Sequence, residues 1–369
     1  TIFLLNSSPE SVRSSNNELS YISSKAIVMD GKNGEFTISD GTTVGYSWPS
    51  VQAVLSPELI ARFEQETEQI DFNNDYESRV GYLSKVPHKG NRVLANIPFG
   101  IDKDGNVATI HFEDEFFGTF ICGASRSGKT TLLHTIINGL LCHHPDDVEL
   151  WLIDFKKVEF AQYIEHHPPH VRYILLENSP EIVFDIVDEL TNRLNIRKEG
   201  WTKLADVPSN RSMPAIVIII DEFSEMSGIL ASAEDYREKF RLLFSEGAAF
   251  GFRFILSCQA FSEGTKGLAE FAKMMIQQRI VLKSQKSEIK ATLDISNISE
   301  DDQYLVENLT PHYALQRMPL DIRGNRLKKV HILYLKEKQR QFDWIDRMSL
   351  PSTMTAVRRY DPYNDTVYG

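Results

Sequence analysis

The sequence predicts an α/β fold in which a mostly parallel central sheet is covered by helices on both faces, with a small β-rich region before it. Short apolar runs, typical of strands buried on both faces, alternate with segments whose apolar residues recur at helical spacing. One such run leads directly into a glycine-rich loop, and another ends in an acidic pair. With 369 residues and 42% hydrophobic side chains, the chain is long enough for one large or two medium cores.

Residues 1–92 are expected to form a lead-in region of short strands and one helix. The strands are bounded by Asp-Gly and Asn-Gly turns, and we place them at residues 2–5, 26–29 and 35–38. A helix is predicted at residues 57–70, because Pro57 stands at a favoured first-turn position. No pattern here indicates chemistry, so the region is interpreted as a lead-in domain or as the tail of a preceding repeat.

Residues 93–348 are expected to form the main domain. A hairpin around Asp104 and Gly105 comes first, and then a strand runs into the glycine-rich loop. We predict helices at residues 131–141, 180–197 and 236–250, and strands at residues 119–122, 148–153, 171–176, 215–220, 252–258, 279–283, 313–317 and 330–335. This alternation predicts a parallel sheet. Residues 349–369 lack periodicity and are expected to be irregular.

The glycine-rich loop fits the pattern G-x-x-x-x-G-K-[ST] at every fixed position, between a predicted strand and a predicted helix. Backbone amides of such a loop and of the following helix N-terminus can surround the phosphates of a nucleotide. Lys129 is expected to reach the β- and γ-phosphates, and Thr130 to offer its hydroxyl to Mg²⁺. The predicted nucleotide-binding residues are Gly123, Ala124, Ser125, Arg126, Ser127, Gly128, Lys129, Thr130 and Thr131. The loop therefore predicts a site for ATP and Mg²⁺, against the plainer alternative of a glycine turn that caps a helix.

An acidic pair, Asp221 and Glu222, follows the apolar strand at residues 215–220. Asp221 is expected to bind Mg²⁺ through water, as a second metal-binding residue beside Thr130. Glu222 is expected to polarise the attacking water as a general base, so that it joins Lys129 as a catalytic residue. Acidic pairs after strands often only cap helices, but together with a complete phosphate loop the pair indicates ATP hydrolysis.

Gln259 ends the strand at residues 252–258 and is the third predicted catalytic residue. Its amide is placed to contact the γ-phosphate or the attacking water, while an ordinary polar strand end is the alternative. Asp154, at the end of the strand at residues 148–153, is a candidate for an indirect role at the same edge.

The charge balance limits the partners. A net charge of −11 argues against an extended nonspecific surface for nucleic acid, although it leaves room for a small basic channel. The one local concentration of basic residues is expected to be a solvated turn rather than a phosphate contact. It comprises Arg323, Arg326, Lys328 and Lys329.

Cysteine and histidine spacing indicates neither a disulfide framework nor a metal site. The three cysteines are far apart and form no Cys-x-x-Cys pair, which favours a cytoplasmic location. The histidine clusters at residues 143–144 and 166–170 lack partners at ligand spacing. No apolar run approaches the roughly 20 residues of a membrane helix, and the chain begins at Thr1 without a methionine. We interpret the chain as a piece of a longer protein, in which any membrane anchor lies outside this segment.

Taken together, these motifs resemble the FtsK/SpoIIIE family of ATP-driven translocases over residues 96–340. The resemblance is carried by ordered segments at residues 97–106, 152–163, 218–223, 251–259, 278–283 and 290–294. It implies a RecA-like motor core that works as a ring, usually a hexamer, with ATP at the subunit edge and a substrate in the middle. The lead-in region also resembles the join between tandem motor domains of one parent chain.

The resemblance does not determine which polymer the domain moves. Family members mostly move double-stranded DNA, so a DNA translocase is the first expectation, with a pore lined by residues 224–233 and 260–267 and with Lys266 as a phosphate contact. The EssC-like branch powers protein secretion, and a protein substrate is the second expectation. A nucleotide-gated scaffold with slow turnover is the third, and the intact Glu222 argues against it.

One departure from the family concerns coupling between subunits. Many relatives carry an arginine a few residues before the glycine of the Gln-ending strand, whereas this chain has Ala248 there. Arg241, Arg253 and Arg279 remain candidates to reach a neighbour's γ-phosphate, and the sequence does not choose between them.

Overall fold

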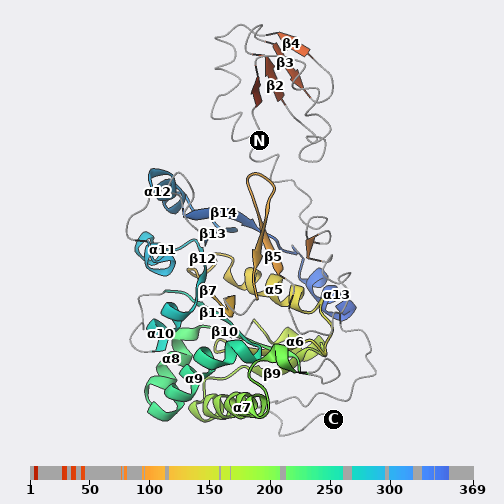
Figure 1. Ribbon diagram of the computed structural model, residues 1–369. Coiled ribbons are helices and arrows are strands. Elements are labelled where there is room, and N and C mark those ends of the chain that lie inside the picture. The colour runs from red at the N-terminus through yellow and green to blue at the C-terminus, as the bar shows by residue number, and fades with distance from the viewer. Residues whose placement is uncertain are drawn as a thin grey trace. The chain divides into compact units, whose positions relative to one another are not determined.

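The structure is a computed structural model that describes part of the chain. The described residues are 4–6, 27–30, 35–38, 43–45, 76, 79, 80, 94 and 96–112, together with 116–348 except 158, 167, 208–212, 261–267, 296–298, 319–325 and 336. The chain divides into two compact units, Thr1–Phe72 and Asn73–Gly369, and each is described by itself (Figure 1). The helix predicted at residues 57–70 and the irregular tail predicted at 349–369 lie outside the described residues.

The first unit contains a small sheet, as the turn-rich sequence predicts. Its strands are β1 (Leu4–Asn6), β2 (Ile27–Asp30), β3 (Glu35–Ile38) and β4 (Thr43–Gly45), hydrogen-bonded in that order. β1 runs parallel to β2, and the other neighbouring pairs are antiparallel. The sequence does not predict β4, because a strand of 3 residues is too short to show alternation.

The second unit is built on a 10-stranded sheet of described strands, in the order β6-β5-β14-β13-β12-β7-β11-β10-β8-β9. The strands are β5 (Ile97–Asp102), β6 (Val107–Ile110), β7 (Gly118–Cys122), β8 (Val148–Asp154), β9 (Val171–Leu175), β10 (Ala215–Asp221), β11 (Phe252–Cys258), β12 (Gln278–Leu282), β13 (Tyr313–Arg317) and β14 (Leu327–Ile332). Neighbours from β12 to β9 are parallel. The remaining pairs are antiparallel. The predicted mostly parallel sheet is confirmed.

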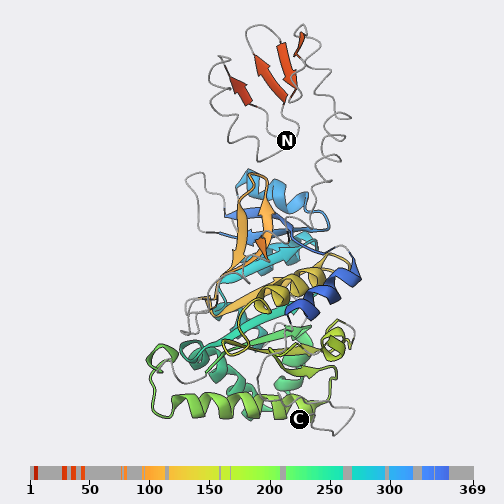
Figure 2. The ribbon, with the colours of Figure 1, turned by 90° about the vertical axis from the view of Figure 1, so that its right-hand side faces the viewer.

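Helices cover both faces of this sheet, which confirms the predicted α/β fold class (Figures 1 and 2). One face carries α5 (Lys129–Leu140), α6 (Gln162–His166) and α13 (Lys338–Met348). The other face carries α7 (Pro180–Lys198), α8 (Phe223–Ala231), α9 (Glu234–Gly247), α10 (Leu268–Met275), α11 (Lys286–Leu293) and α12 (Glu300–Glu307). The long helices α5, α7 and α9 match the predicted ones, whereas the shorter helices were not predicted.

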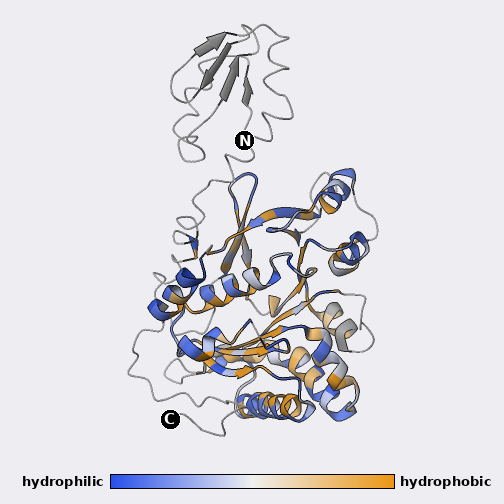
Figure 3. Cartoon of the chain, turned by 180° about the vertical axis from the view of Figure 1, so that it is seen from behind, coloured by the Kyte–Doolittle hydropathy of each residue, from blue (hydrophilic) through white to orange (hydrophobic). Residues whose placement is uncertain are grey.

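Strand β10 shows why the centre of the sheet is apolar. All of its residues are buried, and alternate side chains enter opposite core clusters, with Ile218 on one face and Ile219 on the other. A strand buried on both faces needs apolar side chains at every position. Figure 3 shows this pattern, with hydrophobic strands inside and hydrophilic colour along the outer surfaces of the helices.

Part of the chain before the predicted main domain belongs to the second unit. Tyr76 and Val80 are buried in a small cluster with Trp344 of α13. The Tyr76 hydroxyl accepts a hydrogen bond from the amide of Asn138 on α5 at 2.8 Å. The domain boundary predicted at residue 92 stays a prediction, while the division into compact units falls after Phe72.

Helix α5 lies very close to strand β5, and a glycine allows this approach. A Cβ on Gly139 would stand 2.5 Å from Cγ2 and 2.9 Å from Cδ1 of Ile97, both shorter than real contacts. The Thr135 hydroxyl also fixes the helix by donating to the Leu333 carbonyl at 2.6 Å. Because α5 carries the phosphate loop at its start, this packing sets the position of the loop.

We expect Gly139→Ala to lower the free energy of unfolding by about 1–3 kcal/mol, because the new methyl group overpacks the contact with Ile97. Gly228→Ala in α8 is the matched control, since a Cβ there meets no described atom within 4 Å. The control should raise the free energy of unfolding by about 0.5–1 kcal/mol, as alanine favours a helix. Urea unfolding measures the free energy of unfolding of both variants. Equal changes would show that the packing of α5 on β5 does not require a glycine at position 139.

Candidate functional site

The glycine-rich loop follows strand β7, and the two neighbouring strands hold it in place. The amide of Gly123 donates to the Cys258 carbonyl at the end of β11 at 3.2 Å. The amide of Ala124 donates to the Lys283 carbonyl, just after β12, at 3.1 Å. Gly128 closes the loop with a φ of 102°, in the left-handed region that favours glycine, and α5 begins at the next residue.

The loop presents donors that suit phosphate. The amide of Leu132 bonds back to the Gly128 carbonyl at 3.0 Å, so the amides of the helical residues before it have no acceptor inside the helix. Ser127 Oγ is buried and has no hydrogen-bond partner among the described residues. Such a hydroxyl is rare, and a phosphate oxygen would satisfy it. A Cβ on Gly123 would lie 2.5 Å from this oxygen and 2.9 Å from Cβ of Leu282, so glycine allows the loop to pack closely here.

The ammonium group of Lys129 lies between the two predicted acidic residues. Its Nζ is 2.6 Å from Glu222 Oε1 and 3.0 Å from Asp221 Oδ1. All three side chains are buried. Burial opposes the charge on the ammonium, but the two carboxylates outweigh burial and raise the pKa of Lys129. The fold therefore brings the predicted phosphate-binding lysine together with the predicted metal-binding and general-base residues.

A hydrogen bond from strand β11 holds Asp221, and an unusual backbone conformation orients Glu222. The Ser257 hydroxyl of β11 donates a short hydrogen bond to Asp221 Oδ1. Burial acts to raise the pKa of Asp221, but Lys129 and this hydrogen bond hold it below its usual value. Glu222 has left-handed backbone angles of φ 57° and ψ 55° between β10 and α8, which costs a non-glycine residue about 1 kcal/mol or more.

Asp154 organises the loop that follows strand β8. Its carboxylate accepts hydrogen bonds from the amides of Lys156 at 2.9 Å and Glu159 at 2.7 Å. Asp154 pairs with Asp221 across β8 and β10, so this loop lies beside the acidic pair. The Lys156 ammonium forms a short ion pair with Glu222 Oε1. Lys156 was missed from the sequence, where the only signal was the family-like segment around it.

Glu159, also missed from the sequence, lies beside the predicted magnesium ligand. The Thr130 hydroxyl acts to lower the pKa of the Glu159 carboxyl group, but burial outweighs this effect and raises that pKa. The Thr130 hydroxyl, a water on Asp221 and phosphate oxygens together fit the hard-oxygen preference of Mg²⁺. Among the described residues, no three His, Cys, Asp or Glu side chains are grouped to hold a metal alone. A magnesium ion here would depend on the nucleotide phosphates for its other ligands.

Gln259 stands at the end of β11, beside the glycine-rich loop. The residue before it, Cys258, pairs with Cys122 across β11 and β7. The Gln259 carbonyl accepts a hydrogen bond from the Cys122 thiol at 3.7 Å, and its side chain is half-buried. This position is compatible with a contact to the γ-phosphate, which remains a prediction.

All three arginine candidates are engaged within the fold, and two of them are buried. Arg253 and Arg279 are buried, and they donate to backbone carbonyl groups at 2.7 Å and 3.2 Å respectively. Arg241, on α9, pairs with Glu238 at 2.7 Å, and 33% of its side chain is exposed. Arg241 also lies over the ring of Phe271, and it is the most exposed of the three.

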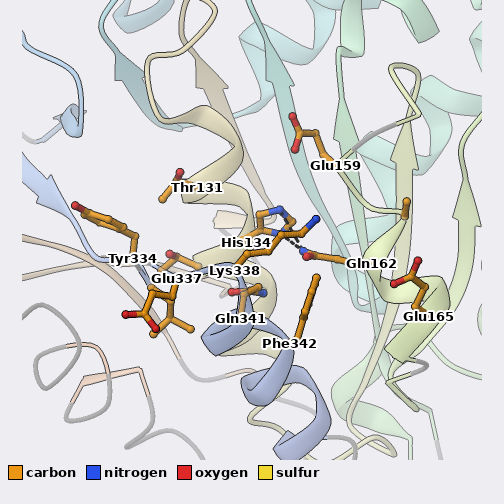
Figure 4. A pocket seen from close by; sticks show the side chains of 13 residues that line it. Thr131, His134, Glu159, Gln162, Glu165, Tyr334, Glu337, Lys338, Gln341 and Phe342 are labelled. Carbon is orange, nitrogen blue, oxygen red and sulfur yellow. Dashed lines mark hydrogen bonds between the residues drawn. The ribbon is translucent and has the colours of Figure 1, made fainter.

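A cavity of about 400 Å³ flanks helix α5 (Figure 4). Its walls come from α5, from the loop and helix after β8, and from α13 with the residues before it. Thr131, a predicted nucleotide-binding residue, and Glu159 both line it. His134 pairs with the Tyr163 hydroxyl at 2.8 Å in its wall, and burial lowers the pKa of His134 to about 4, so the imidazole is neutral at neutral pH.

Comparison with known proteins connects this site to one family. Residues 88–205 match the model of the FtsK/SpoIIIE family. The ESX secretion system protein EccC of Thermomonospora curvata is 27% identical over 219 residues, covering 54% of this chain and 16% of EccC. The DNA translocase SftA of Bacillus subtilis is 24% identical over 226 residues, covering 57% of this chain and 23% of SftA. The DNA translocase FtsK of Chlamydia muridarum is 30% identical over 158 residues, covering 38% of this chain and 20% of FtsK.

The chain thus matches less than a quarter of the length of these relatives. Among solved structures, the cytoplasmic domain of the Thermomonospora curvata type VII secretion ATPase EccC aligns with a TM-score of 0.56 and 23% identity, over 72% of this chain and 32% of that one. EssC (ATPases 2 and 3) of Geobacillus thermodenitrificans aligns with a TM-score of 0.52 and 15% identity, over 70% and 48% of the two chains. Both likenesses show the fold. No helix among the described residues is long and apolar enough to span a membrane.

We expect Glu159→Gln to raise the Mg²⁺ concentration needed for half-maximal ATP binding by about tenfold, because a neutral amide holds the Thr130 hydroxyl less firmly. Glu165→Gln is the matched control, since Glu165 lines the same cavity from α6 (Figure 4). Calorimetric titration with ATP at stepped Mg²⁺ concentrations measures the change. The same response in both variants would remove Glu159 from the site.

Proposed function

We propose, from the premise that this chain carries an FtsK/SpoIIIE family ATPase domain, that it binds ATP with Mg²⁺, hydrolyses it and uses the turnover to move a polymer. The observation that supports this proposal most is the buried contact of Lys129 with Asp221 at 3.0 Å and with Glu222 at 2.6 Å. One lysine at the start of α5 is thereby shared between the phosphate loop and the acidic pair. Its ammonium can exchange carboxylate oxygens for phosphate oxygens.

The residues divide the proposed reaction between them. Binding of ATP draws Lys129 to the β- and γ-phosphates, because the triphosphate carries more negative charge than the carboxylates. The Thr130 hydroxyl and a water on Asp221 would hold Mg²⁺, which would supply positive charge to the phosphates. Glu222 accepts a proton from the attacking water. Gln259 contacts the γ-phosphate or that water.

We also propose that the domain works in a ring, as the family resemblance implies. The ring is formed by identical copies, with a hexamer as the first expectation, or by tandem motor domains of one parent chain. In this proposal residues 1–92 join two motors, residues 93–348 form one motor, and Arg241 reaches the neighbouring site. The matched EccC structure is a cytoplasmic domain. We place this segment in the cytoplasm too, with any membrane anchor elsewhere in the parent protein.

Duplex DNA is one candidate for the moved polymer, supported by relatives that are named DNA translocases. The residues expected to line the pore give it little support. We expected residues 224–233 to be a pore loop that follows the acidic strand, but residues 224–231 belong to helix α8, and Met226 and Leu230 pack into the core. That helix contains no lysine or arginine. Residues 261–267, with Lys266, lie outside the described residues.

A protein substrate is the second candidate, and specific observations favour it. The net charge of −11 opposes binding to a polyanion. Two basic residues of the cluster near 328 are engaged within the fold, since Lys328 pairs with Asp102 at 3.0 Å and Lys329 lies over the ring of Tyr313. The EccC relative, 27% identical over 219 residues, is named a secretion system protein. We therefore propose secretion-type transport of a polypeptide ahead of DNA translocation.

We expect Glu222→Gln to lower the rate of ATP hydrolysis by about 100-fold or more and to keep ATP affinity, because the amide cannot take a proton from water. Glu225→Gln, on the exposed face of the first turn of α8, is the control and should keep wild-type turnover. Phosphate release and calorimetric binding measure the two quantities. Wild-type turnover in Glu222→Gln would exclude Glu222 as the general base.

We expect linear duplex DNA to change ATP turnover by less than about twofold at low salt, because helix α8, which occupies one of the expected pore segments, contains no lysine or arginine. The assay follows phosphate release with and without duplex across a salt series. Stimulation of several-fold that fades as salt rises would contradict this expectation and establish DNA as the substrate.

A further inference from the structure

The carboxylate of Glu222 is held by two ammonium groups at once. Lys129 Nζ lies 2.6 Å from its Oε1, and Lys156 forms a short ion pair with the same oxygen. The described residues place no hydrogen-bond donor on Oε2. One oxygen of the carboxylate is therefore anchored, while the other is left for a further partner.

Binding of ATP removes one of these two partners. In the proposed function Lys129 moves to the phosphates, whereas the Glu222 side chain is only 9% exposed and stays at the end of β10. A buried carboxylate that loses its counter-charge is destabilised by several kcal/mol. The incoming phosphates add negative charge nearby, which increases this cost.

Asp154 fixes the backbone of the turn that carries Lys156. The Lys156 amide donates to Asp154 Oδ1 at 2.9 Å, while the amide of Glu159 donates to Asp154 Oδ2 at 2.7 Å, so the carboxylate fixes both ends of the turn. Strand β8, which ends at Asp154, pairs directly with β10, which leads into Glu222. The turn that carries Lys156 therefore follows the strand on one side of β10, whereas β11 and β7 lie on its other side.

We propose that Lys156 is a positioning residue for hydrolysis: it stays on Glu222 Oε1 after the nucleotide takes Lys129, and it keeps Oε2 directed at the attacking water. This inference rests on the proposed function, because it assigns Lys156 a task only if Glu222 is the general base. Lys156 touches neither phosphate nor water in this role. Loss of Lys156 should therefore lower the rate of hydrolysis and leave the affinity for ATP nearly unchanged.

The test compares Lys156→Ala, Lys156→Arg and a control, Lys239→Ala. Lys239 pairs with Asp188 far from the site, and its side chain is 37% exposed, close to the 41% of Lys156. Lys156→Ala should slow single-turnover hydrolysis by about 10–100-fold with less than about a threefold change in ATP affinity. Lys156→Arg should keep most of the rate, because it restores the cation, and the control should match the wild type.

Three results would overturn the assignment. A rate that is unchanged or increased in Lys156→Ala would show that the pair is idle or inhibitory. A loss of ATP affinity in place of rate would make Lys156 a phosphate contact. A further loss of rate when Lys156→Ala is added to Glu222→Gln would show that Lys156 does not act through Glu222.

The same set of variants separates this inference from the proposed function. If Glu222→Gln hydrolyses ATP at the wild-type rate, the proposed function and the role of Lys156 both fail. If Glu222→Gln is inactive and Lys156→Ala is unimpaired, only the role of Lys156 fails. Retained ATP binding in each variant shows that it is folded.

Discussion

Buried charge at the ends of neighbouring strands is the constraint on which this structure depends. Asp221 and Glu222 are 1% and 7% exposed, and ionised groups that deep in a protein require partners. Lys129 supplies one positive charge to the two carboxylates, and Lys156 supplies a second from the loop after β8. The two positive charges of these lysines balance the two negative charges of Asp221 and Glu222 before any nucleotide binds. In the proposed function, phosphate displaces a carboxylate from Lys129, so nucleotide binding frees Glu222, the proposed general base.

The parallel order of the strands makes this cluster possible. In a parallel sheet all strand ends that carry functional residues meet at one edge. Here β7 leads into the phosphate loop, β10 into the acidic pair, β11 into Gln259 and β8 into the turn of Asp154, and these strands are adjacent in the order β7-β11-β10-β8. Apolar side chains on both faces fix the register, as with Asp154 opposite Asp221. The helices on each face then only need to cover the strands, apart from α5, whose close packing positions Lys129.

The parts of this molecule that could be predicted are those with a local signal. Each predicted strand is a short run of apolar residues, and each long helix has apolar residues at helical spacing. The phosphate loop has a motif with fixed glycine, lysine and threonine positions. These patterns predict the sheet and the acidic residues at its edge. Helix α8 could not be predicted as such, because its 9 residues are too few to establish a period. The contact of Lys156 with Glu222 joins residues 66 positions apart, and no local pattern carries that information. The same is true of Glu159 beside Thr130.

The exchange of partners at Lys129 is the central claim, and a binding measurement on Lys129→Ala tests it most directly. Calorimetric titration with ATP in the presence of Mg²⁺, on protein whose circular dichroism shows a retained fold, gives the affinity of variant and wild type. We predict that the variant loses about 100-fold or more in affinity, because a charge-assisted contact with the phosphates is removed. Wild-type affinity in Lys129→Ala would contradict the account.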